Sequence, residues 1–317
     1  MKLSIILPTF NRLDLLSEAI QSILHHQPWI YEIIIADDGS TDGTDTWCLK
    51  LKDTSPSTQI VISRSSKNLG AQKARNRGYQ IAQGDVVMFM DSDDILAKDG
   101  VVPLLQQLER YPDLDYVYGN VVRTNAFLKP TAHVLPVGSS FSSNAAEIAG
   151  YHWHTMGAIY RKDYLQKVGP WNEKLTGSQD WEFQARVKLM GGVGKFIDHT
   201  VGYWRDHSAE RVGTKKFRLD YVESVIEACL SIHDKAKAMS KLDSALERRL
   251  MKKLLLHTLE LSVYDYPAIR QKHLMRSLDS ICFNLPIKLV IQILLLLPPQ
   301  VDLLLWKIFS RKQFLYP

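Results

Sequence analysis

Three features are scarce in or absent from this sequence: cysteine, glycine-rich phosphate-binding motifs, and an apolar run long enough to span a membrane. The 317 residues include only three cysteines, Cys48, Cys229 and Cys282, which lie far apart and without the spacing of metal ligands. This use of cysteine is typical of reduced thiols in a cytosolic protein. The motifs Gly-x-Gly-x-x-Gly and Gly-x-x-x-x-Gly-Lys-Ser/Thr do not occur, so a bound nucleotide would need a metal ion to hold its phosphates.

The two ends of the sequence bear on where the protein acts. Met1-Lys2-Leu3 leads directly into a short apolar strand without the apolar region of a signal peptide, so we expect a cytoplasmic protein. Near the other end, the apolar segments 285–297 and 301–309 are separated by Pro298-Pro299. Each segment is shorter than the roughly 20 residues that a membrane-spanning helix needs.

Charge is distributed unevenly along the chain. Residues 1–209 hold 21 Lys and Arg against 23 Asp and Glu, whereas residues 210–317 hold 18 against 11. The basic C-terminal part favours an anionic partner, either a membrane surface or nucleic acid. Its basic residues alternate with too many leucines and isoleucines for a solvated nucleic-acid-binding arm, so we expect no nucleic acid partner.

Short apolar strands alternate with helical segments through the first 95 residues. The predicted strands are 2–7, 30–36, 59–63 and 86–90, and the predicted helices are 13–24, 42–52 and 71–82. This alternation predicts an α/β fold with a mostly parallel, doubly wound sheet flanked by helices. Farther along we expect a helix at 101–108, a strand at 115–122, a polar loop at 129–144, a strand around 151–154 and a helix at 181–190.

An aspartate cluster directly follows the strand predicted at 86–90. Asp91, Asp93 and Asp94 are three carboxylates within four residues, and carboxylates this close repel one another unless a cation or a donor lies between them. Oxygen ligands of this kind suit Mg²⁺ or Mn²⁺, and ligands bind at the carboxyl ends of strands in open α/β sheets. The alternative is an acidic loop in which Asp93 or Asp94 caps the next helix.

Other polar residues stand at equivalent places near strand ends and helix starts. Asp37 and Asp38 follow the second strand, where carboxylates can accept hydrogen bonds from ribose hydroxyls or a base N–H. Arg75, on the third predicted helix, has the planar donor group that matches a diphosphate.

Four linked motifs in this region resemble the family 2 glycosyltransferases. They are Pro8-Thr9-Phe10-Asn11-Arg12, Asp37-Asp38-Gly39-Ser40-Thr41-Asp42, Asn68-Leu69-Gly70 with Ala74-Arg75-Asn76-Arg77-Gly78, and Gly84-Asp85 through Asp91-Ser92-Asp93-Asp94. The resemblance implies a GT-A fold, which is Rossmann-like, that binds a nucleoside-diphosphate sugar together with a divalent metal ion, Mn²⁺ or Mg²⁺.

The resemblance also implies roles for individual residues. Asp38 would contact the nucleoside base with Thr9 alongside it, Asp91 would hold the ribose or the sugar, and Asp93 would bind the metal. The residues expected to bind the donor are Pro8, Thr9, Asn11, Arg12, Asp37, Asp38, Gly70, Arg75, Asp91 and Ser92. The expected metal ligands are Asp91, Asp93 and His207, the last from an Arg-x-His pattern at Arg205 to His207.

The expected catalytic base is Asp180, near the start of the helix at 181–190. By residue type alone, Asp180 could equally be an N-cap. The resemblance implies that it deprotonates the acceptor hydroxyl, although Gln179 stands where the family commonly has Glu. Expected acceptor contacts are Gln179, Trp181 and His154; Trp181 could instead fill the core, and His152 and His154 could instead bind a metal.

The chain is therefore predicted to contain a GT-A catalytic domain at 1–210 followed by an α-helical extension at 211–317. Within the first, residues 1–95 would bind the nucleotide sugar, and residues 96–210 would bind the acceptor and supply the base. In the extension we expect helices at 217–231, 240–263 and 268–283. The apolar and basic tail at 285–317 predicts peripheral contact with the inner face of the cytoplasmic membrane, the alternative being a helical core or a homo-oligomer contact.

The predicted function is an inverting, metal-dependent glycosyltransferase of cell-surface polysaccharide biosynthesis. We expect a UDP-sugar donor and, as acceptor, a hydroxyl of a glycan or of a lipid-linked saccharide. One alternative is a polyprenyl-phosphate sugar transferase of the same fold, and another is a non-catalytic nucleotide-sugar-binding protein. A nucleotidyltransferase is disfavoured, because the sequence has no glycine-rich N-terminal loop for a triphosphate.

Overall fold

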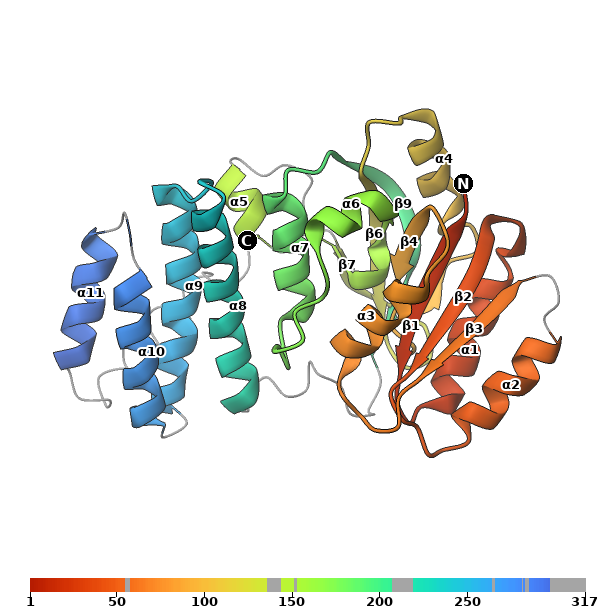
Figure 1. Ribbon diagram of the computed structural model, residues 1–317, viewed down its shortest axis with the longest axis horizontal. Helices are drawn as coiled ribbons and strands as arrows, with labels where there is room; N and C mark the ends of the chain where they lie inside the picture. The colour runs from red at the N-terminus through yellow and green to blue at the C-terminus, as the bar shows by residue number, and fades with distance from the viewer. Residues whose placement is uncertain are drawn as a thin grey trace. The chain divides into compact units, whose positions relative to one another are not determined.

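The chain divides into two compact units in the computed structural model, which describes residues 1–54, 58–135, 144–150, 153–206, 219–263, 266–280, 282 and 285–296 (Figure 1). The sheet unit comprises Met1–Ser139, His152–Glu173 and Met190–Ala209. The helical unit comprises Ser140–Tyr151, Lys174–Leu189 and Glu210–Pro317. The helical unit thus gathers two segments that precede residue 210, including the one that carries Asp180.

The sheet unit is built on one sheet that has nine strands among the described residues. The strands are β1 (Leu3–Thr9), β2 (Ile30–Asp37), β3 (Gln59–Arg64), β4 (Val86–Phe89), β5 (Ile95–Leu96), β6 (Tyr116–Thr124), β7 (Pro130–Leu135), β8 (Ala158–Arg161) and β9 (Gly194–Arg205). Its helices are α1 (Leu13–Leu24), α2 (Thr44–Thr54), α3 (Ala71–Ile81), α4 (Val102–Arg110) and α6 (Lys162–Val168), with 3₁₀ turns at Gln27–Trp29 and Thr155–Gly157.

The order of strands is β3-β2-β1-β4-β8-β6-β9-β5, with β7 beside β6. The first four strands in this order are parallel, as are β6 and β9, whereas β8 runs antiparallel to both of its neighbours. The sequence prediction of a mostly parallel sheet flanked by helices is confirmed. Helices flank such a sheet because the connections between its parallel strands cross over its faces.

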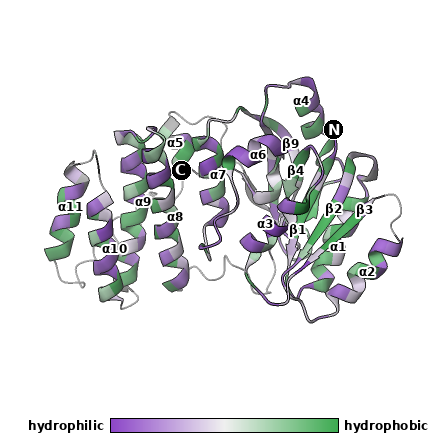
Figure 2. Ribbon diagram, viewed as in Figure 1, coloured by the Kyte–Doolittle hydropathy of each residue, from purple (hydrophilic) through white to green (hydrophobic). Residues whose placement is uncertain are grey.

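Apolar residues on both faces of β1 hold helices against the sheet, and Figure 2 shows the apolar colour along β1 and β2. Leu3, Ile5 and Leu7 belong to one buried cluster with Leu16 and Ile20 of α1. The other face meets α3 at Gly78, where an added Cβ would lie 2.6 Å from Cγ2 of Ile6. A glycine is needed there because helix and strand approach too closely for a side chain.

The helical unit contains α5 (Asn144–Ala149), α7 (Gln179–Leu189), α8 (Leu219–Ala238), α9 (Ser244–Val263), α10 (Pro267–Ser280) and α11 (Leu285–Leu296). Its buried cluster includes Val225 and Ile232 of α8 together with Leu250 and Leu254 of α9. Helical spacing beyond residue 215 therefore predicted the helices correctly. Among the described residues, no helix combines the length and the hydropathy needed to cross a membrane.

Two local predictions were wrong. The segment 129–144 was expected to be a polar loop, but β7 pairs with β6 there, for example Val134 with Val122. A strand was expected around 151–154, but Trp153 and His154 precede the 3₁₀ turn at Thr155–Gly157, and the strand β8 begins only at Ala158. The N–H of Gly157 donates to the carbonyl of His154 at 2.7 Å, which closes this turn. His152 lies outside the described residues.

Candidate active site

The ends of β1, β2 and β4 lie side by side at one edge of the sheet. Thr9 is the register partner of Asp37, and the N–H of Asp38 donates to the carbonyl of Thr9 at 2.9 Å. The N–H of Met90 donates to the carbonyl of Ile6 at 3.0 Å, so Asp91 emerges next to the end of β1. The carboxyl edge of a parallel sheet is where α/β folds bind their ligands.

The loop after β1 is tied to the loop after β2. The N–H of Asn11 donates to Ser40 Oγ at 2.9 Å, and the Oδ1 of Asn11 accepts from the N–H of Thr41 at 2.7 Å. Asn11 has a φ of 48°, a left-handed conformation that asparagine tolerates better than most residues. Pro8 pairs with Ala36, and the buried Oγ1 of Thr9 has no hydrogen-bond partner among the described residues.

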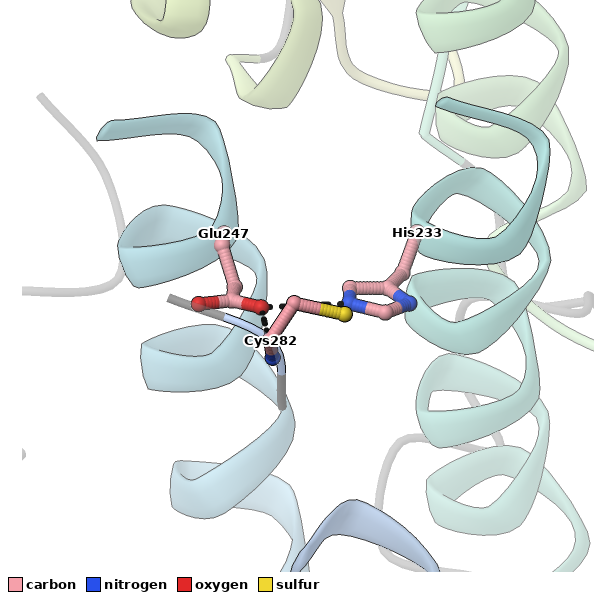
Figure 3. Close-up of side chains that lie close together, drawn as sticks. All are labelled: His233, Glu247 and Cys282. Atoms are coloured by element: carbon pink, nitrogen blue, oxygen red, sulfur yellow. Dashed lines mark hydrogen bonds and ion pairs between the residues drawn. The ribbon is translucent and has the colours of Figure 1, made fainter. Parts of the chain in front are cut away.

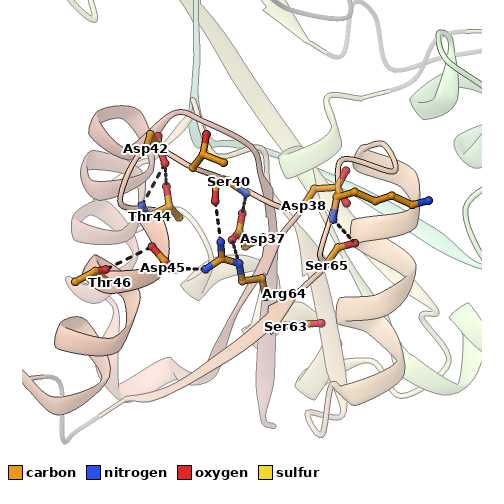
Figure 4. A network of polar contacts seen from close by, with 12 residues as sticks. Asp37, Asp38, Ser40, Asp42, Thr44, Asp45, Thr46, Ser63, Arg64 and Ser65 are labelled. Atoms are coloured by element: carbon orange, nitrogen blue, oxygen red, sulfur yellow. Dashed lines mark hydrogen bonds and ion pairs between the residues drawn. The ribbon is translucent and has the colours of Figure 1, made fainter.

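Asp37 is held by its own loop and by a neighbouring arginine, as Figure 4 shows. Its Oδ1 accepts from the N–H of Ser40 at 3.0 Å, and its Oδ2 lies 3.4 Å from Arg64 Nε. Arg64 also forms an ion pair with Asp45 at 2.5 Å and donates to the carbonyl of Ser40 at 2.8 Å. The hydrogen bond from Arg64 lowers the pKa of Asp45, which therefore stays ionised. This network supports the shape of the loop after β2.

Asp38 anchors the start of α3. Its Oδ2 accepts from the backbone N–H groups of Leu69, at 2.8 Å, and of Gly70, at 2.6 Å. Its Oδ1 lies 3.7 Å from Arg77 Nη1, with no hydrogen bond among the described residues. Gly70 has a φ of 101°, a conformation that glycine adopts readily. One oxygen of Asp38 thus has a structural partner, and the other has hydrogen-bonding capacity left.

The carboxylates of Asp91 and Asp93 each contact an arginine. Arg75 Nη2 donates to Asp91 Oδ1 at 2.5 Å, and its guanidinium lies 4.5 Å from the centroid of the Trp171 ring. Arg12 Nη1 donates to Asp93 Oδ2 at 3.2 Å. Arg12, Arg75, Asp91 and Asp93 come from three of the four motifs, so the structure brings these motifs together in one polar cluster.

Asp94 and His154 form the deeper part of this cluster. Asp94 Oδ1 accepts from the N–H of Arg205 at 3.2 Å, and its Oδ2 lies 3.8 Å from Nδ1 of His154. The His154 ring packs against Trp204 at 5.3 Å between centroids. Ser92 is buried between Asp91 and Asp93, and its Oγ has no hydrogen-bond partner among the described residues.

The three aspartates fit a divalent cation by the chemistry of their donor atoms. Asp91, Asp93 and Asp94 each offer a carboxylate oxygen, and these oxygens lie within 4.8 Å of one another. Carboxylate oxygens are the ligands that Mg²⁺ and Mn²⁺ prefer. The side chain of Asp91 is 32% exposed, so a ligand can reach the cluster from solvent.

Asp180 lies in the first turn of α7, within the helical unit. Its Oδ1 accepts from the N–H of Trp181 at 2.8 Å, at the end of the helix where backbone N–H groups favour a negative charge. Gln179 is 9% exposed and donates to the carbonyl of Leu175 at 3.3 Å. The prediction of a helix starting near Asp180 is confirmed.

Trp181 lies in the core of the helical unit. It is 2% exposed, and its indole N–H donates to the carbonyl of Ala149 at 3.2 Å. Lys253 Nζ of α9 lies 3.7 Å from the centroid of its ring. Burial lowers the pKa of Lys253, an effect that the charge of Asp180 partly offsets. The sequence allowed Trp181 either to contact the acceptor or to fill the core, and these contacts agree with the core position.

Several residues that position this chemistry were given no role in the sequence prediction. Arg64 and Arg77 form ion pairs with Asp37 and Asp38, and the Trp171 ring packs against the guanidinium of Arg75. The charge of Asp180 acts on Lys253 and partly offsets the lowering of its pKa by burial. Only the arginine-rich stretch of α3 gave a sequence signal for any of them. His207, a predicted metal ligand, lies outside the described residues, which end in this segment at Asp206.

Comparison with known proteins assigns the chain to a family. The sequence matches the family described as Glycosyl transferase family 2 over residues 4–169, which is more than half of the chain. The chain belongs to this family. It is thus a glycosyltransferase, as the motifs predicted.

Two curated relatives illustrate the range of the match. The chain is 26% identical over 191 residues to the uncharacterized glycosyltransferase YwdF of Bacillus subtilis (strain 168), covering 59% of this chain and 68% of the relative. It is 36% identical over 120 residues to the GalNAc(5)-diNAcBac-PP-undecaprenol beta-1,3-glucosyltransferase of Campylobacter jejuni, covering 38% of each. The chain thus spans less than two thirds of the length of the second relative.

Solved structures share the fold. TarS 1–349 of S. aureus, solved in complex with UDP-GlcNAc, matches with a TM-score of 0.64 at 17% identity over 89% of this chain and 82% of that one. The mannosyltransferase PcManGT of Pyrobaculum calidifontis, in complex with GDP-Man and Mn²⁺, matches with a TM-score of 0.57 at 18% identity over 98% and 87%. The predicted GT-A fold with C-terminal helices is confirmed.

Proposed function

We propose that this glycosyltransferase transfers a sugar from a nucleoside-diphosphate sugar to an acceptor hydroxyl, with the donor and a divalent metal ion bound at the carboxyl edge of the sheet. The observation that carries the proposal is the polar cluster of Asp91, Asp93 and Asp94 with Arg12 and Arg75. Carboxylates and guanidinium groups side by side are what a metal–diphosphate complex requires. The complexes of TarS with UDP-GlcNAc and of PcManGT with GDP-Man and Mn²⁺ lend support, and a UDP-sugar is our first candidate donor.

The donor would occupy the loops after β1, β2 and β4. The free hydrogen-bonding capacity of Thr9 Oγ1 and Asp38 Oδ1 would be used by the nucleoside, since both atoms are buried. Pro8, Asn11, Asp37 and Gly70 would shape this part of the site through the loop contacts described above. Ser92 and Asp91 would contact the ribose or the sugar.

Asp91 and Asp93 would hold the metal ion, with His207 as a further ligand. When bound, the ion supplies positive charge against the leaving diphosphate. Arg12 and Arg75 would add donors to the same phosphates, because each already lies within hydrogen-bond distance of a metal-binding carboxylate.

Asp180 would take the proton of the acceptor hydroxyl as this oxygen attacks the anomeric carbon. A sugar hydroxyl is a poor nucleophile until a base removes its proton in the transition state. A single displacement of this kind inverts the anomeric configuration. Gln179 and His154 are kept as proposed acceptor contacts, and Trp181 would support the acceptor site by packing in the core beneath it.

The acceptor would be a glycan or a lipid-linked saccharide of the cell surface. The name of the Campylobacter jejuni relative, which acts on an undecaprenyl-diphosphate-linked glycan, supports a lipid-linked acceptor. The alternative of polyprenyl phosphate as acceptor differs only in the attacking group, a phosphate oxygen in place of a hydroxyl. We place the protein in the cytoplasm, at the inner face of the membrane.

Contact with the membrane would use α11. This helix exposes Leu289, Ile293 and Leu296, with exposed fractions of 58%, 47% and 86%, on one side of the helix. Lys288 is on the same helix, in a part of the chain with excess positive charge. The rest of the predicted tail, 297–317, lies outside the described residues.

Sedimentation with lipid vesicles tests the membrane contact. We expect the full chain to bind vesicles containing anionic lipid, and the double variant Leu289→Ser and Ile293→Ser to bind them less. Leu49→Ser, at another exposed leucine that is 61% exposed on α2, is the matched control and should bind as the wild type does. Equal binding by both variants would contradict the proposed contact.

The donor site is tested by calorimetric titration with UDP-, GDP- and dTDP-sugars, with and without Mn²⁺. We expect metal-dependent binding of one donor, lost in Asp93→Asn. The control is Asp99→Asn, which alters an exposed aspartate five residues beyond the cluster. The assignment of Asp93 as a metal ligand would be contradicted if donors bound equally well without Mn²⁺, or if Asp93→Asn bound the donor as the wild type does.

A further inference from the structure

A second cluster of metal-ligating side chains lies in the helical unit, away from the predicted motifs. His233 comes from α8, Glu247 from the first turn of α9, and Cys282 from the connection between α10 and α11. One ligand atom of each lies within 4.8 Å of the others. Figure 3 shows the carboxylate of Glu247 and the thiol of Cys282 directed at the same edge of the imidazole ring.

The contacts of His233 define which ring nitrogen is available. Its Nδ1 lies 3.1 Å from Oδ1 of Asp234, and an ionised carboxylate only accepts, so this contact favours the tautomer with the proton on Nδ1. In the neutral ring, Nε2 therefore presents a lone pair. This atom is fully buried and makes no hydrogen bond among the described residues, and it lies 3.5 Å from Oε1 of Glu247.

Two acceptor atoms thus face each other in a buried place. Glu247 is 0% exposed, and its Oε1 also accepts from the N–H of Cys282 at 2.5 Å. A buried carboxylate opposite a lone pair is unfavourable unless a proton or a cation lies between them. The two solutions are an imidazolium–carboxylate pair and a metal ion that both groups bind.

The third side chain favours the metal ion. The Sγ of Cys282 supplies a thiolate ligand beside the nitrogen and oxygen ligands, and the residue is exposed, so an ion can enter from solvent. Two ligands at bonds of about 2.0–2.1 Å to a tetrahedral Zn²⁺ lie roughly 3.3–3.4 Å apart. The observed 3.5 Å between His233 Nε2 and Glu247 Oε1 is close to this separation.

We propose that His233, Glu247 and Cys282 bind a Zn²⁺ ion, with a fourth position open to water. Asp234 would be a positioning residue, because its carboxylate fixes the tautomer and orientation of His233. The ion would join α8, α9 and the α10–α11 connection. Its mixed nitrogen, oxygen and sulfur ligands suit zinc, whereas the aspartate cluster of the sheet unit has oxygen ligands only.

Titration of the metal-free full chain with Co²⁺ tests the site. Binding to Cys282 gives a thiolate-to-cobalt charge-transfer band in the near ultraviolet, which an all-oxygen site does not give. We expect one equivalent of Co²⁺ to produce the band and one equivalent of Zn²⁺ to abolish it. The band should be lost in Cys282→Ser and in His233→Gln, and the affinity should fall about 10–100-fold in Asp234→Ala.

Two control variants separate this site from others in the chain. Asp93→Asn removes a ligand of the proposed donor-site metal and should leave the band unchanged. His273→Gln alters another buried histidine of the unit, which lies 3.3 Å from Glu223, and should also leave it unchanged. A band that survives in Cys282→Ser would overturn the proposal.

Alkylation of the wild-type chain gives a test that needs no variant. Burial raises the pKa of the Cys48 and Cys229 thiols to about 12, so the exposed Cys282 is the cysteine expected to react in the folded protein. We expect Zn²⁺ to protect Cys282 from iodoacetamide and a chelator to restore its reaction. Reaction at the same rate in both conditions would overturn the proposal.

Discussion

The two units each hold a cluster of potential cation ligands, and the clusters differ in their charged partners and in their exposure to solvent. In the sheet unit, Asp91 and Asp93 contact Arg75 and Arg12, and Asp91 is open to solvent. In the helical unit, His233 and Glu247 are fully buried. Oxygen ligands with arginine partners, one of them partly open to solvent, suit a ligand that arrives and leaves with each turnover. Buried nitrogen and oxygen ligands beside a thiol suit an ion that stays bound.

The units also differ in how their residues were recognised. Each motif of the sheet unit is a contiguous run of residues at a strand end or a helix start, whereas the contacts of the helical unit join single residues on separate helices. The following predictions test this contrast, starting with the largest expected effect.

The proposed base in the helical unit should affect chemistry without affecting the donor site of the sheet unit. Asp180→Asn removes the proton acceptor but keeps the size of the side chain, so we expect kcat to fall by about 10²–10⁴-fold. Donor affinity measured by calorimetry should stay unchanged. Asp198→Asn, at an exposed aspartate of β9, is the control and should keep full activity. A loss of donor affinity equal to the loss of kcat would show that the roles are not divided in this way.

Buried charge should matter more in the helical unit than exposed charge does in the sheet unit. Arg186 donates to both carboxylate oxygens of Glu182 at 2.8 and 2.9 Å, with both side chains buried. Arg186→Met would leave this carboxylate buried without its partner, which costs about 3–5 kcal/mol in the free energy of unfolding. Denaturant titration measures the change.

The matched control is the partly exposed pair of Arg123 and Asp206, whose side chains are 35% and 45% exposed. Arg123→Met should cost only about 0–1 kcal/mol. Equal losses in Arg186→Met and Arg123→Met would remove the distinction between the units.

A substitution in the closely packed part of the sheet unit should lower stability without changing the helical unit. Gly78→Ala would place a methyl group 2.6 Å from Ile6 Cγ2, so we expect the free energy of unfolding to fall by roughly 1–3 kcal/mol. Combining it with Ile6→Leu, which lacks the Cγ2 methyl that the added group would meet, should recover part of this loss. The cobalt band of the helical unit should not change in Gly78→Ala, and its loss would show that the units fold as one.

The smallest expected effect concerns pH. Burial lowers the pKa of Lys253 in the folded chain from its ordinary value of 10.5, so the unfolded chain binds more protons in the window below that value. Stability contributed by this group therefore rises with pH up to about 10.5 and falls as pH decreases. Lys253→Met should flatten the rise between neutral and alkaline pH. An identical pH profile of unfolding in the variant would contradict a lowered pKa.

Regular local patterns predicted much of the fold. The helix at Leu13–Leu24 was predicted with its bounds, because apolar residues at helical spacing face the sheet. The strand β7 was not predicted, since it exists through pairing with β6 rather than through its own apolar pattern. In the same way, the burial of Trp153 depends on tertiary packing, with Tyr160 accepting its indole N–H at 2.8 Å.

The candidate sites show the same limit. Strand ends gave the positions of Asp37, Asp38 and Asp91, because parallel strands bring their carboxyl ends to one edge. The use of Asp38 as an anchor for the N–H groups of Leu69 and Gly70 depends on a loop conformation that the motif does not specify. His233, Glu247 and Cys282 are single residues that belong to no contiguous motif, so only the packing of the helices brings them together.

The measurement that tests the account most directly is proton NMR of the sugar released when water replaces the acceptor. With the donor identified by calorimetry and Mn²⁺ present, the account predicts that the first sugar released has the anomeric configuration opposite to that of the donor. It also predicts that Asp93→Asn releases none above the rate without enzyme. Release of the retained anomer, or full activity without a metal ion, would contradict a single displacement at a metal-dependent donor site.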